Sequence, residues 1–150
     1  MGAILDMIVS SVAIITTKSG EKINGMTAAW VAQASFEPPL VVVSIAPERY
    51  THQLITESKV FAVNILSEGQ VKLGRKFGLK SGRDVDKFKG VDYVTKKTGS
   101  PILKDVYAYL DCELHKTCNA GDHTLFIGEV VEYKVWEGKK PLVFRTNDYF

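Results

Sequence analysis

Two apolar runs on either side of Glu37-Pro38-Pro39 constrain the fold of this chain more than any other feature. Residues 23–36 and 40–45 carry many apolar and β-branched side chains, and the prolines between them mark a turn. The sequence therefore predicts two strands that run back on each other. The second run, LVVVSI, is almost entirely apolar, so we expect it to be buried on both faces of a sheet.

The turn brings together two patches of small and hydroxyl-bearing residues, GMTAA at residues 25–29 and SIAPERYTH at residues 44–52. Small side chains leave the backbone bare, so that a flat ligand can approach it closely. The polar side chains around this surface offer hydrogen bonds. The small residues are Gly25, Ala28 and Ala29, and the polar ones are Thr27, Ser44, Thr51 and His52. We expect a planar, phosphorylated cofactor to bind here.

The remaining chain alternates short β-branched runs with turn residues, which is typical of strands. A helix is expected at residues 51–58 with Thr51 as its N-cap, and a second one opens with the capping-box pair Ser67 and Gln70 and runs to about Phe77. Asn24-Gly25 fits either a tight hairpin turn or a place within the strand of residues 23–36, and we prefer the strand. Further strands are predicted at residues 9–17, 61–66, 91–95, 106–116, 124–135 and 141–144, with one helical turn at residues 84–88.

Many strands with few short helices favour a closed antiparallel barrel over alternating βαβ units. No G-x-G-x-x-G motif follows the first strand, so a dinucleotide-binding Rossmann unit is not expected. No repeat, low-complexity tract or linker interrupts the sequence. Residues 1–150 are therefore predicted to form one domain.

Composition excludes several classes of partner. The chain has 150 residues, 45% of them hydrophobic, and a net charge of +2, with its basic residues scattered. Such a charge argues against nucleic acid or an anionic membrane as the main partner. No apolar run reaches the roughly 18 residues that a membrane span needs, and the first residues lack the features of a signal peptide. We expect a cytoplasmic protein.

Cys112, His115 and Cys118 lie close enough in sequence to suggest a metal site. They belong to a predicted strand, in which the two cysteines share one face and His115 points to the other. Six residues at about 3.3 Å each separate the sulfurs by ~20 Å, too far for a disulfide or a shared metal. We interpret both cysteines as small strand residues, and no metal site is expected.

Four segments in order give the chain its resemblance to a known family. They are NGMTAAWVAQASFEPPLVVVSIAPERYTH at residues 24–52, FAVNILSEGQ at residues 61–70, FGLKSGRDVDKF at residues 77–88 and GDHTLFIGEVVEY at residues 121–133. Together they closely resemble the flavin reductase family, in which a split β-barrel binds FMN or FAD. The resemblance implies a mainly β fold, a Greek-key split barrel with a few short helices.

The resemblance also implies the site. The flavin is expected to contact Thr27, Ala28, Ala29 and Trp30, and its ribityl or phosphate group to contact Ser44, Ile45, Ala46, Arg49, Thr51 and His52. A helix that begins at Thr51 presents free N–H groups and a positive dipole end to an anion, although Thr51 also fits a simple cap. Lys80, Ser81 and Arg83 lie in a loop that folds over the cofactor in relatives, and a solvated basic loop is the alternative. His123 is assigned to orienting the nicotinamide, with a structural hydrogen bond as the alternative.

The implied activity is hydride transfer from NAD(P)H to FMN, with FAD as a possible substitute for FMN. NAD(P)H is then a visiting substrate. Electrons would pass to free flavin, a ferric complex, rubredoxin or a monooxygenase component. The family also implies a homodimer, with Trp30 and Trp136 in the cleft, the interface or the core. Two alternatives stay open: a non-catalytic flavoprotein electron carrier reduced by a separate reductase, and a β-barrel interaction module without cofactor.

Overall fold

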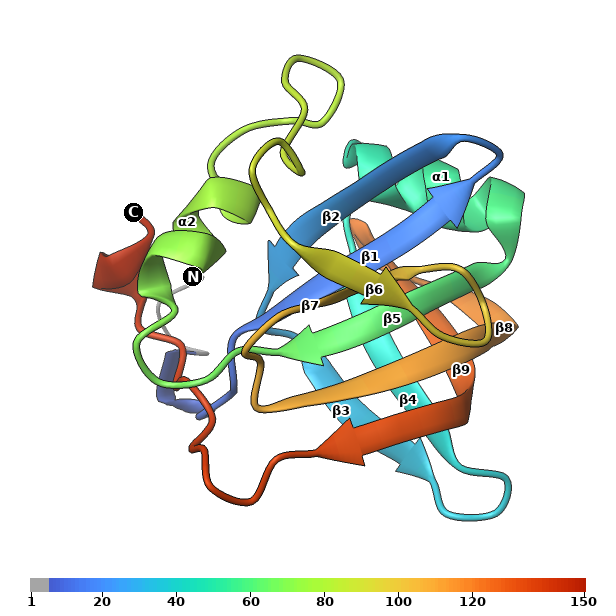
Figure 1. Ribbon diagram of the computed structural model, residues 1–150. Helices are drawn as coiled ribbons and strands as arrows, with labels where there is room; N and C mark the ends of the chain where they lie inside the picture. The colour runs from blue at the N-terminus through green and yellow to red at the C-terminus, as the bar shows by residue number, and fades with distance from the viewer. Residues whose placement is uncertain (1–5) are drawn as a thin grey trace.

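A curled antiparallel sheet forms the body of the protein (Figure 1). The computed structural model describes residues 6–150, and in this range seven strands pair in the order β2-β1-β5-β8-β9-β4-β3, while β6 and β7 form a separate two-stranded sheet. The strands are β1 Ala13–Ser19, β2 Lys22–Ala28, β3 Val31–Ser35, β4 Leu40–Ile45, β5 Val60–Ile65, β6 Tyr93–Thr95, β7 Pro101–Leu103, β8 Ala108–Ala120 and β9 His123–Val135, and the helices are α1 Tyr50–Ser58 and α2 Val71–Gly78.

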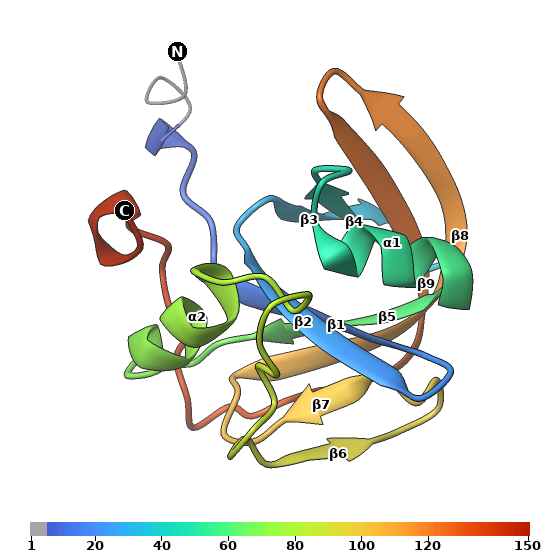
Figure 2. The same ribbon diagram turned by 90° about the horizontal axis from the view of Figure 1, so that it is seen from above.

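The sheet curls until its two edge strands approach each other. The edge strands β2 and β3 are consecutive in the chain, and the Ser44 N–H donates to the Trp30 carbonyl at 3.1 Å where the chain passes between them. Helix α1 packs across one side of this barrel and α2 lies against β2 (Figure 2). The predicted mainly β barrel with a few short helices is confirmed. No helix in residues 6–150 is long and apolar enough to cross a membrane.

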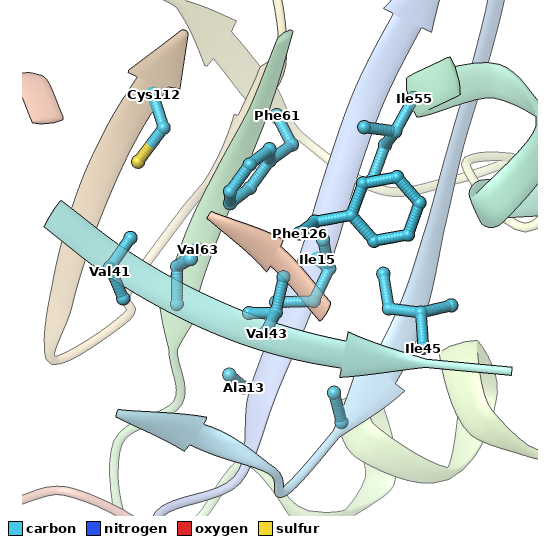
Figure 3. Packing of buried hydrophobic residues seen from close by; sticks show 11 residues of the cluster. Ala13, Ile15, Val41, Val43, Ile45, Ile55, Phe61, Val63, Cys112 and Phe126 are labelled. Atoms are coloured by element: carbon cyan, nitrogen blue, oxygen red, sulfur yellow. The ribbon is translucent and has the colours of Figure 1, made fainter. Parts of the chain in front are cut away.

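Strand β1 separates two hydrophobic clusters because both of its faces are buried. Ala13 and Ile15 point into the barrel, whereas Val12, just before the strand, and Ile14 face the opposite side. Figure 3 shows the barrel cluster, which comprises Ala13, Ile15, Ala28, Val41, Val43, Ile45, Ile55, Phe61, Val63, Cys112 and Phe126. The second cluster packs α2 and the C-terminal segment against the sheet, and it comprises Val12, Ile14, Leu66, Phe77, Phe88, Leu103, Val106, Leu142 and Tyr149.

The strand predicted at residues 23–36 is in fact two strands, so that prediction is wrong. β2 ends at Ala28 and pairs with β1, whereas β3 begins at Val31 and pairs with β4. The break is needed because the chain moves from one edge of the sheet to the other. Asn24 and Gly25 lie within β2, as preferred.

The bounds predicted for β4 are confirmed, but its expected burial on both faces is wrong. Val41, Val43 and Ile45 are buried, and the alternate residues are half-buried. The alternate face of β4 therefore lies outside the barrel core and keeps partial contact with solvent.

Other differences concern short segments. Residues 84–88 form turns rather than a helical turn, and residues 9–12 and 141–144 contribute only the isolated bridges of Ser11 with Val143 and Ser67 with Pro141. Strand β7 was not predicted, and β8 runs four residues beyond its predicted end, to Ala120. Both cysteines lie on β8 as free thiols.

A methyl group added at Gly128 tests the packing of the barrel core. Its Cβ would lie 2.6 Å from Phe61 Cζ and 2.8 Å from Cys112 Cβ, closer than atoms in contact allow. We expect Gly128→Ala to lower the free energy of unfolding by about 1–3 kcal/mol, measured by urea denaturation. Gly138→Ala is the matched control, because nothing lies within 4 Å of its added Cβ. Equal stability of the two variants would contradict the packing described.

Candidate functional site

The ends of β2 and β4 and the beginning of β9 meet beside α1. Ile45 pairs with Thr124 across β4 and β9. The hydroxyl of Thr124 lies 2.8 Å from His52 Nε2 on α1, and the His52 ring packs edge-on against Phe126 with ring centroids 4.9 Å apart. Burial holds the pKa of His52 below its usual 6.5, while the charge of Glu48 opposes this shift. The imidazole is therefore neutral at pH 7 and fixed in place.

An exposed aromatic surface lies next to this junction. The rings of Trp30 and His123 lie 4.7 Å apart at an angle of 44°, and Trp30 is 57% exposed. His123 Nδ1 lies 2.7 Å from the Asp122 carboxylate, which is exposed. Two flat side chains thus face solvent at least in part, Trp30 from the β2–β3 crossing (residues 29–30) and His123 from the start of β9. A planar ring can stack on them.

Helix α1 begins one residue earlier than predicted, and the prediction of Thr51 as its N-cap is wrong. The N-cap is Arg49, which makes no side-chain capping bond. Thr51 lies in the first turn with its side chain buried, and its hydroxyl accepts a hydrogen bond of 3.0 Å from Asn24 Nδ2. An uncapped helix end offers its backbone N–H groups and positive dipole to an anion.

The segment after α2, residues 79–88, runs alongside the edge of β2 (Figures 1 and 2). Arg83 fastens it to the start of α1, since its guanidinium donates to the Glu48 carbonyl at 2.9 Å and lies 5.1 Å from the centre of the Tyr50 ring. Gly82 packs so closely on Asn24 that an added Cβ would lie 2.2 Å from Asn24 Oδ1. The segment, which we call the basic segment for Lys80, Arg83 and Lys87, therefore lies beside the uncapped start of α1.

Lys87 belongs to the basic segment, and the sequence analysis did not identify it as a candidate site residue. Its side chain is 5% exposed, and its Nζ donates to the Gly25 carbonyl at 3.0 Å and to the Phe77 carbonyl at 2.9 Å. Burial, and then the positive charge of Arg49, lowers the pKa of the Lys87 ammonium to about 8.

The structure gathers most of the expected site residues but orients several of them inward. Ala28, Ile45 and Thr51 have buried side chains, and the Thr27 hydroxyl donates to the Gly74 carbonyl. These residues can meet a ligand mainly through their backbone. The residues with half-buried or exposed side chains near the surface are Ala29, Trp30, Ser44, Ala46, Arg49, His52, Lys80, Ser81, Arg83 and His123. Of the two tryptophans, Trp136 packs against Tyr109 and the core, and Trp30 faces solvent.

This arrangement fits a flavin nucleotide. Bare backbone at Ala28 and Ala29 and the aromatic surface of Trp30 suit a flat ring, while the uncapped end of α1 suits a phosphate. Lys87 carries a buried positive charge between β2 and the last turn of α2, and the charge of Arg49, which precedes α1, contributes to lowering its pKa.

Sequence reasoning missed Asn24, Gly82, Lys87 and Thr124. The four residues are polar or small and lie in or beside the motifs, but their partners are distant in sequence. A glycine inside the basic loop was the one signal available, because glycine permits close approach of backbone to a neighbour.

Comparison with known proteins gives consistent similarities. A family model described as "Flavin reductase like domain" matches residues 5–150. The high molecular weight rubredoxin of Moorella thermoacetica is 38% identical over 133 residues, which cover 87% of this chain but only 58% of that protein. Among solved structures, the NADH:FAD oxidoreductase of Streptomyces globisporus has a TM-score of 0.86 and 33% identity, covering 91% of this chain and 82% of the other. An FMN-binding protein from Thermus thermophilus has a TM-score of 0.82 and 36% identity, covering 87% and 74%.

The lowered pKa of His52 has a consequence for stability. The unfolded chain binds a proton on this imidazole more readily than the folded protein, so stability is full above pH 6.5 and is lost as the pH falls through the folded pKa. We expect the free energy of unfolding to fall more between about pH 7 and about pH 5 in the wild type than in His52→Gln. Urea denaturation at each pH measures it.

His115→Gln is the control, because it removes an exposed imidazole from β8. Its pH dependence should match that of the wild type. If His52→Gln showed the wild-type dependence as well, His52 would not be the half-buried, neutral group described.

Proposed function

The chain belongs to the flavin reductase-like family, and we propose that it binds FMN beside the β2–β3 crossing and reduces it with NAD(P)H. The observation that carries the proposal is the meeting of bare backbone, an exposed aromatic surface and an uncapped helix end, with basic groups from two segments, at one place. The match of one family model to nearly the whole chain supports one domain.

The flavin supplies the redox chemistry, since its ring accepts a hydride from reduced nicotinamide. The chain's residues bind it, orient it and exclude water. The backbone between β2 and β3 would lie along the flavin ring, and the residues at the end of β4, the start of α1 and the basic segment would surround the ribityl phosphate. The proposed contacts are Thr27, Ala28, Ala29, Trp30, Ser44, Ile45, Ala46, Arg49, Thr51, His52, Lys80, Ser81 and Arg83.

The choice of FMN rests on the phosphate site. The uncapped α1 end and Arg49 suit the terminal phosphate of FMN, and the similarity to an FMN-binding protein supports this choice. FAD is the alternative, supported by the similarity to an NADH:FAD oxidoreductase. Comparing the two affinities in solution separates them.

His123 is proposed to orient the nicotinamide. Its ring lies 4.7 Å from the exposed ring of Trp30, and its Nδ1 lies 2.7 Å from the Asp122 carboxylate. Stacking of the nicotinamide on this pair would hold it against the flavin ring in the geometry needed for hydride transfer.

The electron acceptor is proposed to be a small redox protein such as rubredoxin. The support is that most of this chain is similar to part of a protein named high molecular weight rubredoxin. Free flavin, a ferric complex or a monooxygenase component are the other acceptors considered. The same similarity favours a second candidate function, a flavoprotein electron carrier reduced by a separate reductase. A cytoplasmic location is part of the proposal.

The purified protein should bind FMN with about one flavin per chain, and anaerobic NADH or NADPH should bleach its visible absorbance. His123→Ala should slow this reduction by about ten- to a thousandfold at saturating nicotinamide, because a contact that positions the donor is lost. Its effect on FMN affinity should be much smaller. Stopped-flow absorbance measures the rate, and fluorescence quenching measures the affinity.

His115→Ala, at an exposed position on the neighbouring strand, is the control and should reduce at the wild-type rate. A protein that holds FMN but is not bleached by either nicotinamide would indicate the electron carrier. A wild-type rate in His123→Ala would remove His123 from the proposed role.

We also propose a homodimer. A cavity of about 460 Å³ opens on the face of the barrel formed by β3, β4 and the far end of β9. Its lining is largely apolar and includes Val31, Leu40, Val130 and Tyr133, the last of which is 68% exposed. A second copy covering this face would remove apolar surface from water.

Light scattering at micromolar concentration should give the mass of a dimer, and Tyr133→Asp should give that of a monomer, since it places a charge in the apolar face. Tyr93→Asp is the matched control, because Tyr93 is also exposed but lies on β6, away from the cavity. A wild-type monomer would contradict the proposal.

A further inference from the structure

One stretch of the chain carries much of its positive charge. Residues 71–97 hold nine of the 19 Lys and Arg residues but only three of the 17 Asp and Glu residues. The stretch has a formal charge of +6, whereas the whole chain has +2, so the other residues together have −4. Basic residues are therefore concentrated here and not scattered evenly, as the composition suggested.

The fold turns this stretch into one surface. α2, the segment that follows it and β6 succeed one another along the same side of the barrel (Figures 1 and 2). A row of aromatic rings joins them, since Phe88 lies 5.1 Å from Phe77 of α2 and 5.3 Å from Tyr93 of β6, measured between ring centroids. The exposed lysines of this surface, which we call the basic face, are Lys72, Lys76, Lys89, Lys96 and Lys97.

The charges of the basic face are not neutralised within the described part of the chain. The ion pairs of residues 6–150 join His123 to Asp122 and Lys139 to Asp105, and neither involves this face. The ammonium of Lys76 donates to a neutral group, the Lys89 carbonyl, at 2.7 Å. The basic face therefore presents a positive potential to solvent.

Apolar side chains lie exposed among these charges. Leu79 and Val94 are 54% and 57% exposed, and Val85 and Tyr93 are exposed as well. Protein-docking surfaces combine apolar contacts with a charged rim, whereas surfaces for nucleic acid are more polar and much more positive. Three aspartates of the same stretch, Asp84, Asp86 and Asp92, would also repel a polyanion. The mixture favours a protein partner with an acidic surface.

The basic face borders the candidate flavin site. Arg83, on the segment between α2 and β6, donates to the Glu48 carbonyl just before α1. On the same segment, Lys87 donates to the Gly25 carbonyl of β2. A protein bound to the outside of this segment would therefore lie next to the flavin site.

We propose that the basic face docks the electron acceptor, a small redox protein with an acidic surface. The inference rests on the proposed function, because it says where the acceptor of that same flavin binds. Each reduced flavin holds two electrons, so two ferric acceptors such as oxidised rubredoxin would each take one and become ferrous, and two protons would pass to solvent. Opposite charges would steer the encounter, and transient redox complexes need only a small contact area.

Calorimetric titration of the whole protein with an oxidised rubredoxin of negative net charge tests the docking without any flavin reduction. The affinity should fall by about tenfold or more between about 0.02 M and about 0.5 M salt, because salt screens exposed charges. Anaerobic mixing of the reduced, FMN-loaded protein with the same rubredoxin should give a second-order rate constant with the same salt dependence. Stopped-flow absorbance measures it.

Lys96→Glu/Lys97→Glu reverses two exposed charges directly after β6, outside the proposed flavin contacts. At low salt it should lower both the rubredoxin affinity and this rate constant by about tenfold, and the difference should vanish at high salt. FMN affinity and the rate of bleaching by NAD(P)H should keep their wild-type values.

Lys59→Glu/Lys116→Glu is the matched control, because it makes the same change in net charge at two exposed lysines elsewhere. They lie after α1 and on β8, where the Leu114 N–H donates to the Lys59 carbonyl. This variant should bind rubredoxin and reduce it as the wild type does.

Equal losses in the two double variants would trace the effect to net charge alone and overturn the proposal. Rubredoxin binding that is absent or independent of salt would overturn it as well, and would leave the proposed function intact if NAD(P)H still bleaches the flavin. Failure of that bleaching would instead contradict the proposed function, and the calorimetric result would still decide the docking. Phosphatidylserine vesicles or single-stranded DNA that bind in place of rubredoxin, and are lost in Lys96→Glu/Lys97→Glu, would make the face a polyanion site and overturn the proposal.

Discussion

The ammonium of Lys87 joins three parts of the chain that are distant in sequence. It bonds to the outer edge of β2 and to the last turn of α2, and it fixes the basic segment that follows α2. A second bond, from the Thr27 hydroxyl to the Gly74 carbonyl, holds α2 against the same strand. These contacts cover the outer edge of β2 and hold the basic segment beside α1, so the shape of the candidate site depends on them.

Most of the barrel could be predicted because its strands carry a local signal. Residues 40–45 are apolar and β-branched, and their bounds were predicted correctly. The break after Ala28 had no such signal, since Ala29-Trp30-Val31 continues a strand-like pattern and only the change of pairing partner separates β2 from β3. Strand β7 has three residues, and the buried Asn64 holds it by accepting from the Leu103 N–H, a contact across 39 residues of sequence.

The site could be predicted where a motif places its residues side by side. It could not be predicted where a partner distant in sequence determines the orientation or burial of a side chain. Trp30 and His123 come from separate motifs, and the structure brings their rings into contact. Thr51 suits an N-cap by local rules, but Asn24, 27 residues earlier, takes its hydroxyl and draws it inward. Burial of Lys87 depends on two carbonyls from β2 and α2, and no local pattern indicates that a lysine in a charged segment is buried.

A crystal structure of the protein with bound FMN tests the central claim most directly. The flavin ring is expected to lie along the backbone of residues 27–30, with the Trp30–His123 pair on its open side. The phosphate is expected between the start of α1 and the basic segment. A flavin found in the apolar cavity beside Tyr133, or a phosphate directed into solvent away from Arg49 and Arg83, would contradict this description of the site.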